Sequence, residues 1–171
     1  MTARLRLVPQ DPAYLVALME SPERFEAVSG LLAAEGLRDF LVSPDVSEAW
    51  LESLRVAGAA DPWFHGFAAV QEETDQVIGT GAFKGPPDEN GVVEIAYGIV
   101  PSFEGQGYAT ELAAALVAFA SADPRVHLLR AHTLPEPNAS THVLQKCGFA
   151  YRGEVIDTED GLVWRWERGR S

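Results

Sequence analysis

Hydrophobic and polar residues follow two periods along the chain. Alternating apolar positions predict strands over residues 4–8, 63–71, 76–84, 92–100, 126–133, 150–156 and 162–167. Apolar positions three and four apart predict helices over residues 13–36, in two pieces, and over 47–57, 110–120 and 138–147. Short polar and Gly/Pro-rich segments between the three central strands predict an antiparallel meander, and Asp160-Gly161 predicts a closing hairpin. The pattern indicates a mixed α+β fold.

Length and composition indicate one globular domain. A chain of 171 residues that is 47% hydrophobic and 22% charged has ordinary globular proportions, so we expect one domain over residues 1–171. The single cysteine, Cys147, excludes an internal disulfide and fits a reducing compartment. No stretch approaches the roughly 18 apolar residues of a membrane-spanning helix, and the first residues lack the apolar segment of a signal peptide. We therefore expect a soluble, cytoplasmic protein without a membrane partner.

The charge balance narrows the choice of partner. The formal net charge of −12 argues against nucleic acid, because nucleic-acid affinity comes largely from Lys and Arg side chains that neutralise phosphates. A cationic acceptor is more compatible with this charge. An acidic surface also serves solubility alone, so the charge does not by itself identify a partner.

A glycine-containing loop follows the strand predicted over residues 92–100. Gly105 and Gly107 let the backbone approach a ligand closely, and the free N–H groups at the start of the next helix favour an anion. Such a loop suits a pyrophosphate, although two glycines before a helix also form simple tight turns. The loop lacks the Gly-Lys-Ser/Thr ending of a nucleotide P-loop and the three-glycine dinucleotide fingerprint.

This segment resembles the coenzyme-binding motif of the GNAT N-acetyltransferase superfamily. The superfamily motif is Gln/Arg-x-x-Gly-x-Gly/Ala, and the chain reads Glu104-Gly105-Gln106-Gly107-Tyr108-Ala109. The motif usually begins with Gln or Arg, so Glu104 is a departure that places an anionic side chain near the expected phosphates.

A second segment, from Thr133 to Phe149, carries a further resemblance. It is similar to the Asn-x-x-Ser and Val-Leu-Glu-Lys-x-Gly-Phe sequences of the GNAT branch that contains the ribosomal-protein alanine acetyltransferases. Asn138 and Ser140 stand one residue closer together than in many members of that branch. Two motifs in the expected order and at the expected distance support the same family.

The resemblance implies a fold, a co-substrate and a set of binding residues. The fold is a central, mostly antiparallel sheet of about six or seven strands flanked by helices, with the coenzyme in the splay between strands four and five. The co-substrate is acetyl-CoA, and the acceptor is an amine of a protein N-terminus or a small molecule. The implied coenzyme-binding residues are Ile99, Val100, Gln106, Gly107, Tyr108, Ala109, Thr110 and Asn138. Asn138 is also a good helix N-cap, which explains the residue equally well.

Direct attack of an amine on the thioester needs a base and a proton for the departing thiolate. Glu94, on the strand beside the expected cleft, is the candidate base, and His132 on the neighbouring strand is the alternative. Many GNAT enzymes carry a tyrosine acid in the last helix, where this chain has Leu144, so we expect Ser140 to donate to the sulfur. Both candidate bases also have structural explanations, as a surface carboxylate and as a packed histidine. Cys147 is expected to be a core residue and not a nucleophile.

Two functions remain open at this level. The chain is either an N-acetyltransferase that works in a ternary complex or a non-catalytic module of the same fold that binds acyl-CoA. Glu104 and the missing tyrosine favour the module, whereas the glycine loop with Glu94, Asn138 and Ser140 favours the enzyme, which we expect. The histidines show no metal-ligand spacing with Cys147, so no metal is expected. The identity of the acceptor stays open, as does the homodimer that is frequent among relatives.

Overall fold

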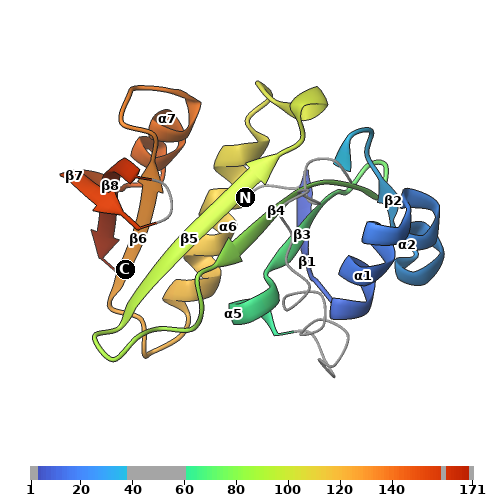
Figure 1. Cartoon of the computed structure of the whole chain (residues 1–171), viewed down its shortest axis with the longest axis horizontal. Coiled ribbons are helices and arrows are strands. Elements are labelled where there is room, and N and C mark those ends of the chain that lie inside the picture. The colour runs from blue at the N-terminus through green and yellow to red at the C-terminus, as the bar shows by residue number, and fades with distance from the viewer. Residues whose placement is uncertain (1–3, 38–60, 159–160, 170–171) are drawn as a thin grey trace.

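The computed structural model describes residues 4–37, 61–158 and 161–169. Figure 1 shows the helices and strands of these segments. Their order begins with β1 (Leu5–Pro9), α1 (Pro12–Glu20), α2 (Pro22–Ser29), β2 (Leu32–Ala33), α5 (Pro62–His65), β3 (Phe67–Gln71) and β4 (Gln76–Phe83). It continues with β5 (Val92–Ile99), the short 3-10 helix η1 (Pro101–Phe103), α6 (Tyr108–Ser121), β6 (Leu128–Thr133), α7 (Ala139–Lys146), β7 (Ala150–Asp157) and β8 (Gly161–Gly169).

Within the described residues, eight strands form one sheet in the order β1-β3-β4-β5-β6-β8-β7, with the two-residue β2 beside β4. Strands β3, β4 and β5 are successively antiparallel, which confirms the predicted meander. Strands β7 and β8 form the predicted hairpin. Among the strands that the structure describes, only the β5–β6 and β2–β4 pairs are parallel, so the predicted mostly antiparallel sheet is confirmed, with one described strand more than the expected six or seven.

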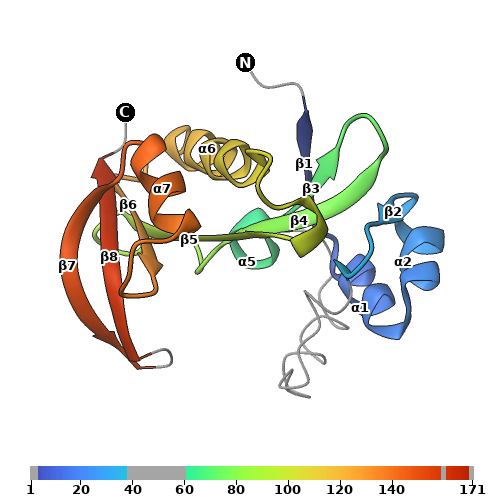
Figure 2. The ribbon, with the colours of Figure 1, turned by 90° about the horizontal axis from the view of Figure 1, so that it is seen from above.

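Helix α6 packs on one face of this sheet through an apolar stripe. Leu112 and Leu116 on that stripe have no exposed surface. Gly81 on β4 lies beneath them, where a Cβ atom would stand 2.9 Å from a methyl carbon of each leucine. The glycine therefore lets the helix approach the strand closely. Figure 2 shows α6 and α7 on one side of the sheet and α1 and α2 on the other.

The predicted N-terminal helix, residues 13–36, is wrong at its C-terminal end. Helix α2 ends at Ser29 because Gly30 adopts a left-handed backbone conformation, with φ of 75°. The chain then forms β2, and the N–H of Leu32 donates to the backbone oxygen of Asp75 beside β4. The helix predicted over residues 47–57 lies outside the described residues.

The strand predicted from Trp63 is wrong at its beginning. Asp61 accepts a hydrogen bond from the Trp63 N–H and caps the single helical turn α5, so the strand starts only at Phe67. The Trp63 ring packs 4.7 Å from the ring of Phe83 and 5.2 Å from that of Phe119, between centroids. The cap and these apolar contacts favour the helical turn over the strand that the alternation predicted.

The parallel strands β5 and β6 pair over only three residue pairs, the last of which joins Glu94 and Arg130. Beyond Glu94, the edge of β5 that faces β6 has no partner strand among the described residues. Figure 1 shows the two strands together at one end and apart at the other. This splay leaves backbone N–H and C=O groups of β5 available to a ligand.

Candidate active site

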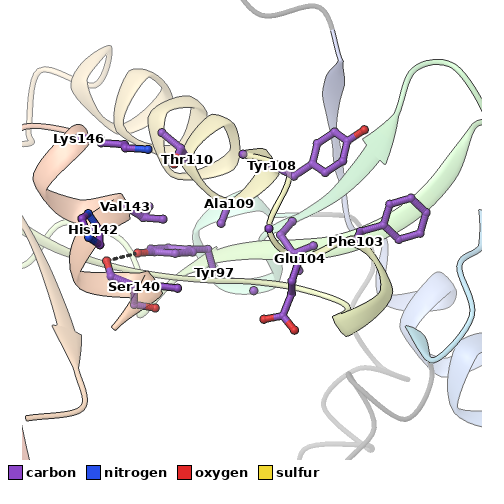
Figure 3. Close-up of a pocket in the computed structure, with 15 residues that line it drawn as sticks. Tyr97, Phe103, Glu104, Tyr108, Ala109, Thr110, Ser140, His142, Val143 and Lys146 are labelled. Carbon is purple, nitrogen blue, oxygen red and sulfur yellow. Dashed lines mark hydrogen bonds between the residues drawn. The ribbon is translucent and has the colours of Figure 1, made fainter. Parts of the chain in front are cut away.

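A cavity of about 520 Å³ lies at the splay (Figure 3). It is bounded by β5, by the loop that leads into α6, and by α7. The lining residues are Tyr97, Gly98, Ile99, Phe103, Glu104, Gly105, Gly107, Tyr108, Ala109, Thr110, Ala139, Ser140, His142, Val143 and Lys146. The cavity therefore joins the two segments that the sequence singled out.

The loop before α6 is shaped by two glycines in the left-handed region. Gly105 has φ of 77° and Gly107, the N-cap residue of α6, has φ of 86°. Among the described residues no side chain caps this helix, so the N–H groups of its first turn are left for another acceptor. A helix start of this kind attracts an anion through its N–H groups and its dipole.

Arg4 supports the same loop from β1. Its guanidinium donates to the backbone oxygen of Gln106 at 2.9 Å, pairs with the carboxylate of Glu111 and lies 4.4 Å from the ring centroid of Tyr108. The Tyr108 hydroxyl accepts a hydrogen bond from Gln71 on β3 at 2.8 Å. Sequence reasoning missed Arg4 because the contact joins residues 102 positions apart and no local pattern signals it.

A capping box fixes the start of α7. Asn138 Oδ1 accepts from the N–H of Thr141, and Thr141 Oγ1 accepts from the N–H of Asn138, both at 3.0 Å. This helix start places Ser140 in the cavity lining (Figure 3). Asn138 itself does not line the cavity, so the contacts that the structure shows for it are those of a cap.

Tyr97 brings a phenol into the cavity from β5. Its hydroxyl donates to the backbone oxygen of Ser140 at 3.5 Å (Figure 3). Burial raises the pKa of Tyr97 to about 12, so the phenol stays protonated at neutral pH. The sequence analysis sought a tyrosine only in the last helix and missed this one. The strand alternation that places Ile95 and Ile99 on the buried face also places Tyr97 there, and this was the available signal.

Two charged side chains take different directions in the cavity. In Figure 3, Lys146 extends from α7 toward Thr110 in the first turn of α6. The carboxylate of Glu104 extends away from that helix start. The cation therefore lies on the side of the first-turn N–H groups, and the anion points elsewhere.

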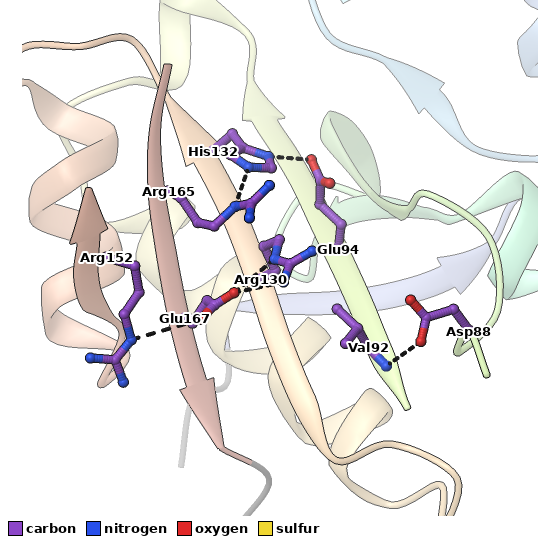
Figure 4. Close-up of polar contacts among 8 residues, drawn as sticks. All are labelled: Asp88, Val92, Glu94, Arg130, His132, Arg152, Arg165 and Glu167. Carbon is purple, nitrogen blue, oxygen red and sulfur yellow. Dashed lines mark hydrogen bonds and ion pairs between the residues drawn. The ribbon is translucent and has the colours of Figure 1, made fainter. Parts of the chain in front are cut away.

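The other face of the sheet carries a row of polar side chains (Figure 4). Side chains alternate along a strand, so Glu94 lies opposite to the face of Tyr97. Glu94 Oε2 is 3.2 Å from Nζ of Lys84 and 2.9 Å from Nδ1 of His132. Nε of Arg165 on β8 donates to Nε2 of His132 at 3.1 Å. The side chains of Glu94 and His132 are 20% and 18% exposed, at the place where β5 and β6 begin to diverge.

The Arg165 contact determines where the His132 proton resides. A guanidinium only donates, so Nε2 of His132 accepts and Nδ1 of the neutral ring carries the proton, which is donated to Glu94. Both ring nitrogens of His132 are therefore used in hydrogen bonds, one to Glu94 and one to Arg165. Glu94 Oε1, in contrast, has no hydrogen-bond partner among the described residues. Of the two predicted bases, Glu94 is therefore the one with an atom, Oε1, that is available to accept a proton.

Residues 4–150 match the family model described as the acetyltransferase (GNAT) domain. The chain belongs to the GNAT acetyltransferase family. The match includes both segments that carried the resemblance, the glycine loop and α7. The predicted family and the predicted GNAT fold are therefore confirmed.

Relatives of this GNAT chain agree with the family match. It is 30% identical over 120 residues to an uncharacterised N-acetyltransferase, p20, of Bacillus licheniformis, which covers 67% of this chain and 65% of the relative, so the match spans just under two thirds of that relative's length. The structure of RimL, a ribosomal L7/L12 alpha-N-protein acetyltransferase in complex with coenzyme A, is similar with a TM-score of 0.68, 16% identity and coverage of 98% and 95%. The spermidine N-acetyltransferase of Vibrio cholerae in complex with CoA and spermine has a TM-score of 0.64, 16% identity and coverage of 99% and 97%. Together the matches agree on the GNAT acetyltransferase family and its fold, as the resemblance predicted.

The structure gathers most of the predicted site residues of this GNAT chain at one cavity. Those that line it are Ile99, Gly107, Tyr108, Ala109, Thr110 and Ser140. The predicted residues outside the lining are Val100, Gln106, Asn138 and Glu94. The Val100 side chain is fully buried and its N–H donates to Ile78, whereas Gln106 uses its backbone oxygen to hold Arg4. Glu94 and Ser140 approach the splay from opposite faces of the sheet.

Cys147 is buried at the end of α7. The thiol donates to the backbone oxygen of Thr110 at 3.8 Å, and the side chain belongs to the hydrophobic core. Burial raises the pKa of the Cys147 thiol, which disfavours the thiolate that a nucleophile needs. The predicted core position of Cys147 is confirmed.

The described segments contain neither a helix that could span a membrane nor a side-chain cluster that could hold a metal ion. None of the helices within residues 4–37, 61–158 and 161–169 is long and apolar enough to cross a membrane. In the same segments, no group of three or more His, Cys, Asp or Glu side chains is placed to hold a metal ion.

Proposed function

We propose that the chain binds acetyl-CoA in the cavity at the splay and transfers the acetyl group to an amine by direct attack in a ternary complex. The observation that carries this proposal is one cavity that joins an unpaired strand edge, on β5, to an uncapped helix start, at α6. The strand edge suits the amide groups of a pantetheine arm, and the helix start suits a pyrophosphate. Two GNAT neighbours of known structure hold CoA, which supports the same co-substrate.

The pyrophosphate is assigned to the loop and first turn of α6. The N–H groups from Gln106 to Thr110 and the Thr110 hydroxyl supply the donors. Lys146 supplies a cation from α7, and Arg4 keeps the loop in place from behind. These contacts neutralise the phosphate charge in a chain whose net charge is otherwise strongly negative.

The pantetheine arm is assigned to β5. The backbone of Ile99 lies on the part of β5 that has left β6, and Ile99 lines the cavity, whereas the N–H of Val100 is used by Ile78 on β4. The start of α7, which Asn138 caps, bounds the cavity opposite the arm. The thioester then lies deeper in the splay, between Tyr97 and Ser140.

The acceptor amine approaches from the face that carries Glu94. Glu94 takes the amine proton through water, and Lys84 and His132 hold its other oxygen in position. As the amine nitrogen bonds to the acetyl carbon, the carbon–sulfur bond breaks and the thiolate departs on the opposite side of the sheet.

The departing thiolate needs a hydrogen-bond donor. The hydroxyl of Ser140 is our assignment, because it lines the cavity at the first turn of α7. Tyr97 is a second donor on the same side, and its raised pKa, about 12, keeps it protonated. Either hydroxyl stabilises the negative charge that develops on sulfur.

One experiment tests this proposal against a non-catalytic module that only binds acyl-CoA. Thiol release from acetyl-CoA is followed with a panel of polyamines, amino acids and peptides with free N-termini, which spans the acceptors of the structural neighbours. Calorimetric titration with CoA is done in parallel. Amine-dependent thiol release supports the enzyme. Binding of CoA without thiol release for any class of amine supports the module and overturns the enzyme.

A further inference from the structure

Arg165 occupies an unusual position on the face that carries Glu94 (Figure 4). Its Nε–H donates to Nε2 of His132 at 3.1 Å, and that nitrogen is neutral. Among residues 4–37, 61–158 and 161–169, no carboxylate lies within ion-pair distance of Arg165. A partly buried guanidinium without a counter-ion is costly, because its remaining N–H groups lose water and gain no anion.

A neighbouring arginine on the same face, in contrast, is paired with a carboxylate. Arg130 on β6 donates through Nε and Nη2 to the carboxylate of Glu167, both at 2.8 Å. Arg152 lies 3.7 Å from the other oxygen of Glu167. The two arginines thus share the carboxylate of Glu167, which is not paired with Arg165.

The register of the strands places Arg165 beside the reaction centre that we propose. Arg165 lies opposite His132 in the β6–β8 pair, and His132 contacts Glu94 where β5 and β6 diverge. One imidazole ring with a hydrogen bond on each side separates the candidate base from the guanidinium. An amine at Glu94 that carries a carboxylate a few bonds away can therefore reach both groups.

We propose that Arg165 binds a carboxylate of the acceptor, so that the acceptor is an amine with an acidic group close to its nitrogen. This inference rests on the proposed function and names its substrate class. A planar guanidinium pairs with a carboxylate through two parallel hydrogen bonds, which fixes orientation as well as charge. The assignment differs from the cationic acceptor that the net charge of −12 suggests, because the local charge at the splay is set by Arg165 and its neighbours and not by the whole surface.

Matched acceptor pairs test the assignment. Alanine and aspartate are compared with alaninamide and asparagine, and a peptide with an N-terminal aspartate is compared with its asparagine counterpart. The first set tests whether the acceptor is a free amino acid, and the second tests whether it is a peptide with an acidic first residue. Spermidine is included to represent the polyamines. We expect kcat/KM to be about tenfold or more higher for the carboxylate member of at least one pair.

Variants of Arg165 link the preference to this side chain. Arg165→Gln is expected to remove the preference by lowering kcat/KM for the carboxylate member about tenfold, with the amide member unchanged, and Arg165→Lys is expected to retain part of it. Arg152→Gln is the control, because Arg152 is more exposed and already pairs with Glu167. Equal turnover of acid and amide members by the unmodified protein, or equal loss for both in Arg165→Gln, would overturn the proposal.

The outcome stays separable from that of the proposed function. If no amine supports thiol release, the proposed function fails, and calorimetric binding of the same pairs to the CoA complex tests Arg165 on its own. Tighter binding of the carboxylate member that is lost in Arg165→Gln supports the anion site. Equal binding of the two members contradicts it.

Discussion

The two faces of the sheet at the splay build their sites from different parts of the chain. Toward α6 and α7, the groups placed for a ligand are mostly backbone, along the edge of β5 and in the turn after Gly107. On the opposite face they are side chains, with Glu94, His132 and Arg165 joined across three strands. A backbone site depends on local conformation and tolerates few substitutions at its glycines. A side-chain site depends on strand register and is free to vary in what it binds.

The largest effect is expected on the backbone side, from Gly107→Val. A β-branched residue is strained at φ of 86°, and a Cβ at this position stands 3.1 Å from a guanidinium nitrogen of Arg4. The loop must move, so we expect the Kd for CoA to rise about a hundredfold or more in a calorimetric titration. Gly85→Val is the matched control, because Gly85 has φ of 88° and no atom near its Cβ position, outside the cavity. Unchanged CoA affinity in a folded Gly107→Val protein would place the anion site elsewhere.

On the side-chain face, Glu94→Gln is expected to lower kcat about a hundredfold and to leave CoA affinity unchanged. The amide keeps the shape of Glu94 but cannot accept the amine proton, so the acidic limb of the pH–rate profile should also flatten. Glu167→Gln is the control carboxylate on the same face, paired with Arg130 at 2.8 Å and not with His132. Equal losses of kcat in the two variants would show that Glu94 acts only through the charge of the face.

The donors to sulfur are expected to give a smaller effect that separates the two hydroxyls. Ser140→Ala should lower kcat about tenfold, and most for strongly basic amines, for which departure of the thiolate limits the rate. Tyr97→Phe is measured beside it because the Tyr97 hydroxyl contacts the Ser140 backbone and not its side chain. A large loss in Tyr97→Phe with full activity in Ser140→Ala would reassign the donor to Tyr97.

The smallest effect is expected from Cys147→Ala. Cys147 lies in the core with a raised thiol pKa, so activity should persist while the free energy of unfolding falls by about 1 kcal/mol in urea titration. An inactive, folded Cys147→Ala protein, together with active Glu94→Gln and Ser140→Ala proteins, would replace direct transfer with an acyl-cysteine route.

The difference between the faces also explains what the sequence could predict. The meander, the hairpin and the glycine loop arise from local patterns, and the resemblance to two local GNAT motifs singled out Gly107, Thr110 and Ser140. Trp63 was placed in a strand because alternation outweighed the capping signal of Asp61-Pro62 just before it. Local sequence patterns therefore predict best the part of the site in which backbone groups are placed to bind the ligand.

Contacts between distant strands could not be predicted in the same way. Arg4 and Gln106 are 102 positions apart, and Arg165 meets His132 only through the β6–β8 register. Single-sequence periodicity places each of these residues on a strand but does not specify its neighbour across the sheet. The sequence offered Glu94 and His132 as candidates, but their contact with each other and with Arg165 came from the structure.

The central claim is that one face of the sheet binds the coenzyme and the other binds the acceptor. It is tested most directly by measuring KM for acetyl-CoA and KM for the acceptor in two variants, Lys146→Ala and Arg165→Gln. Lys146 lines the coenzyme cavity, and Arg165 lies on the other face with Glu94. The account predicts that Lys146→Ala raises KM for acetyl-CoA about tenfold with the acceptor KM unchanged, and that Arg165→Gln does the reverse. A raised KM for acetyl-CoA in Arg165→Gln, with the acceptor KM unchanged, would contradict it.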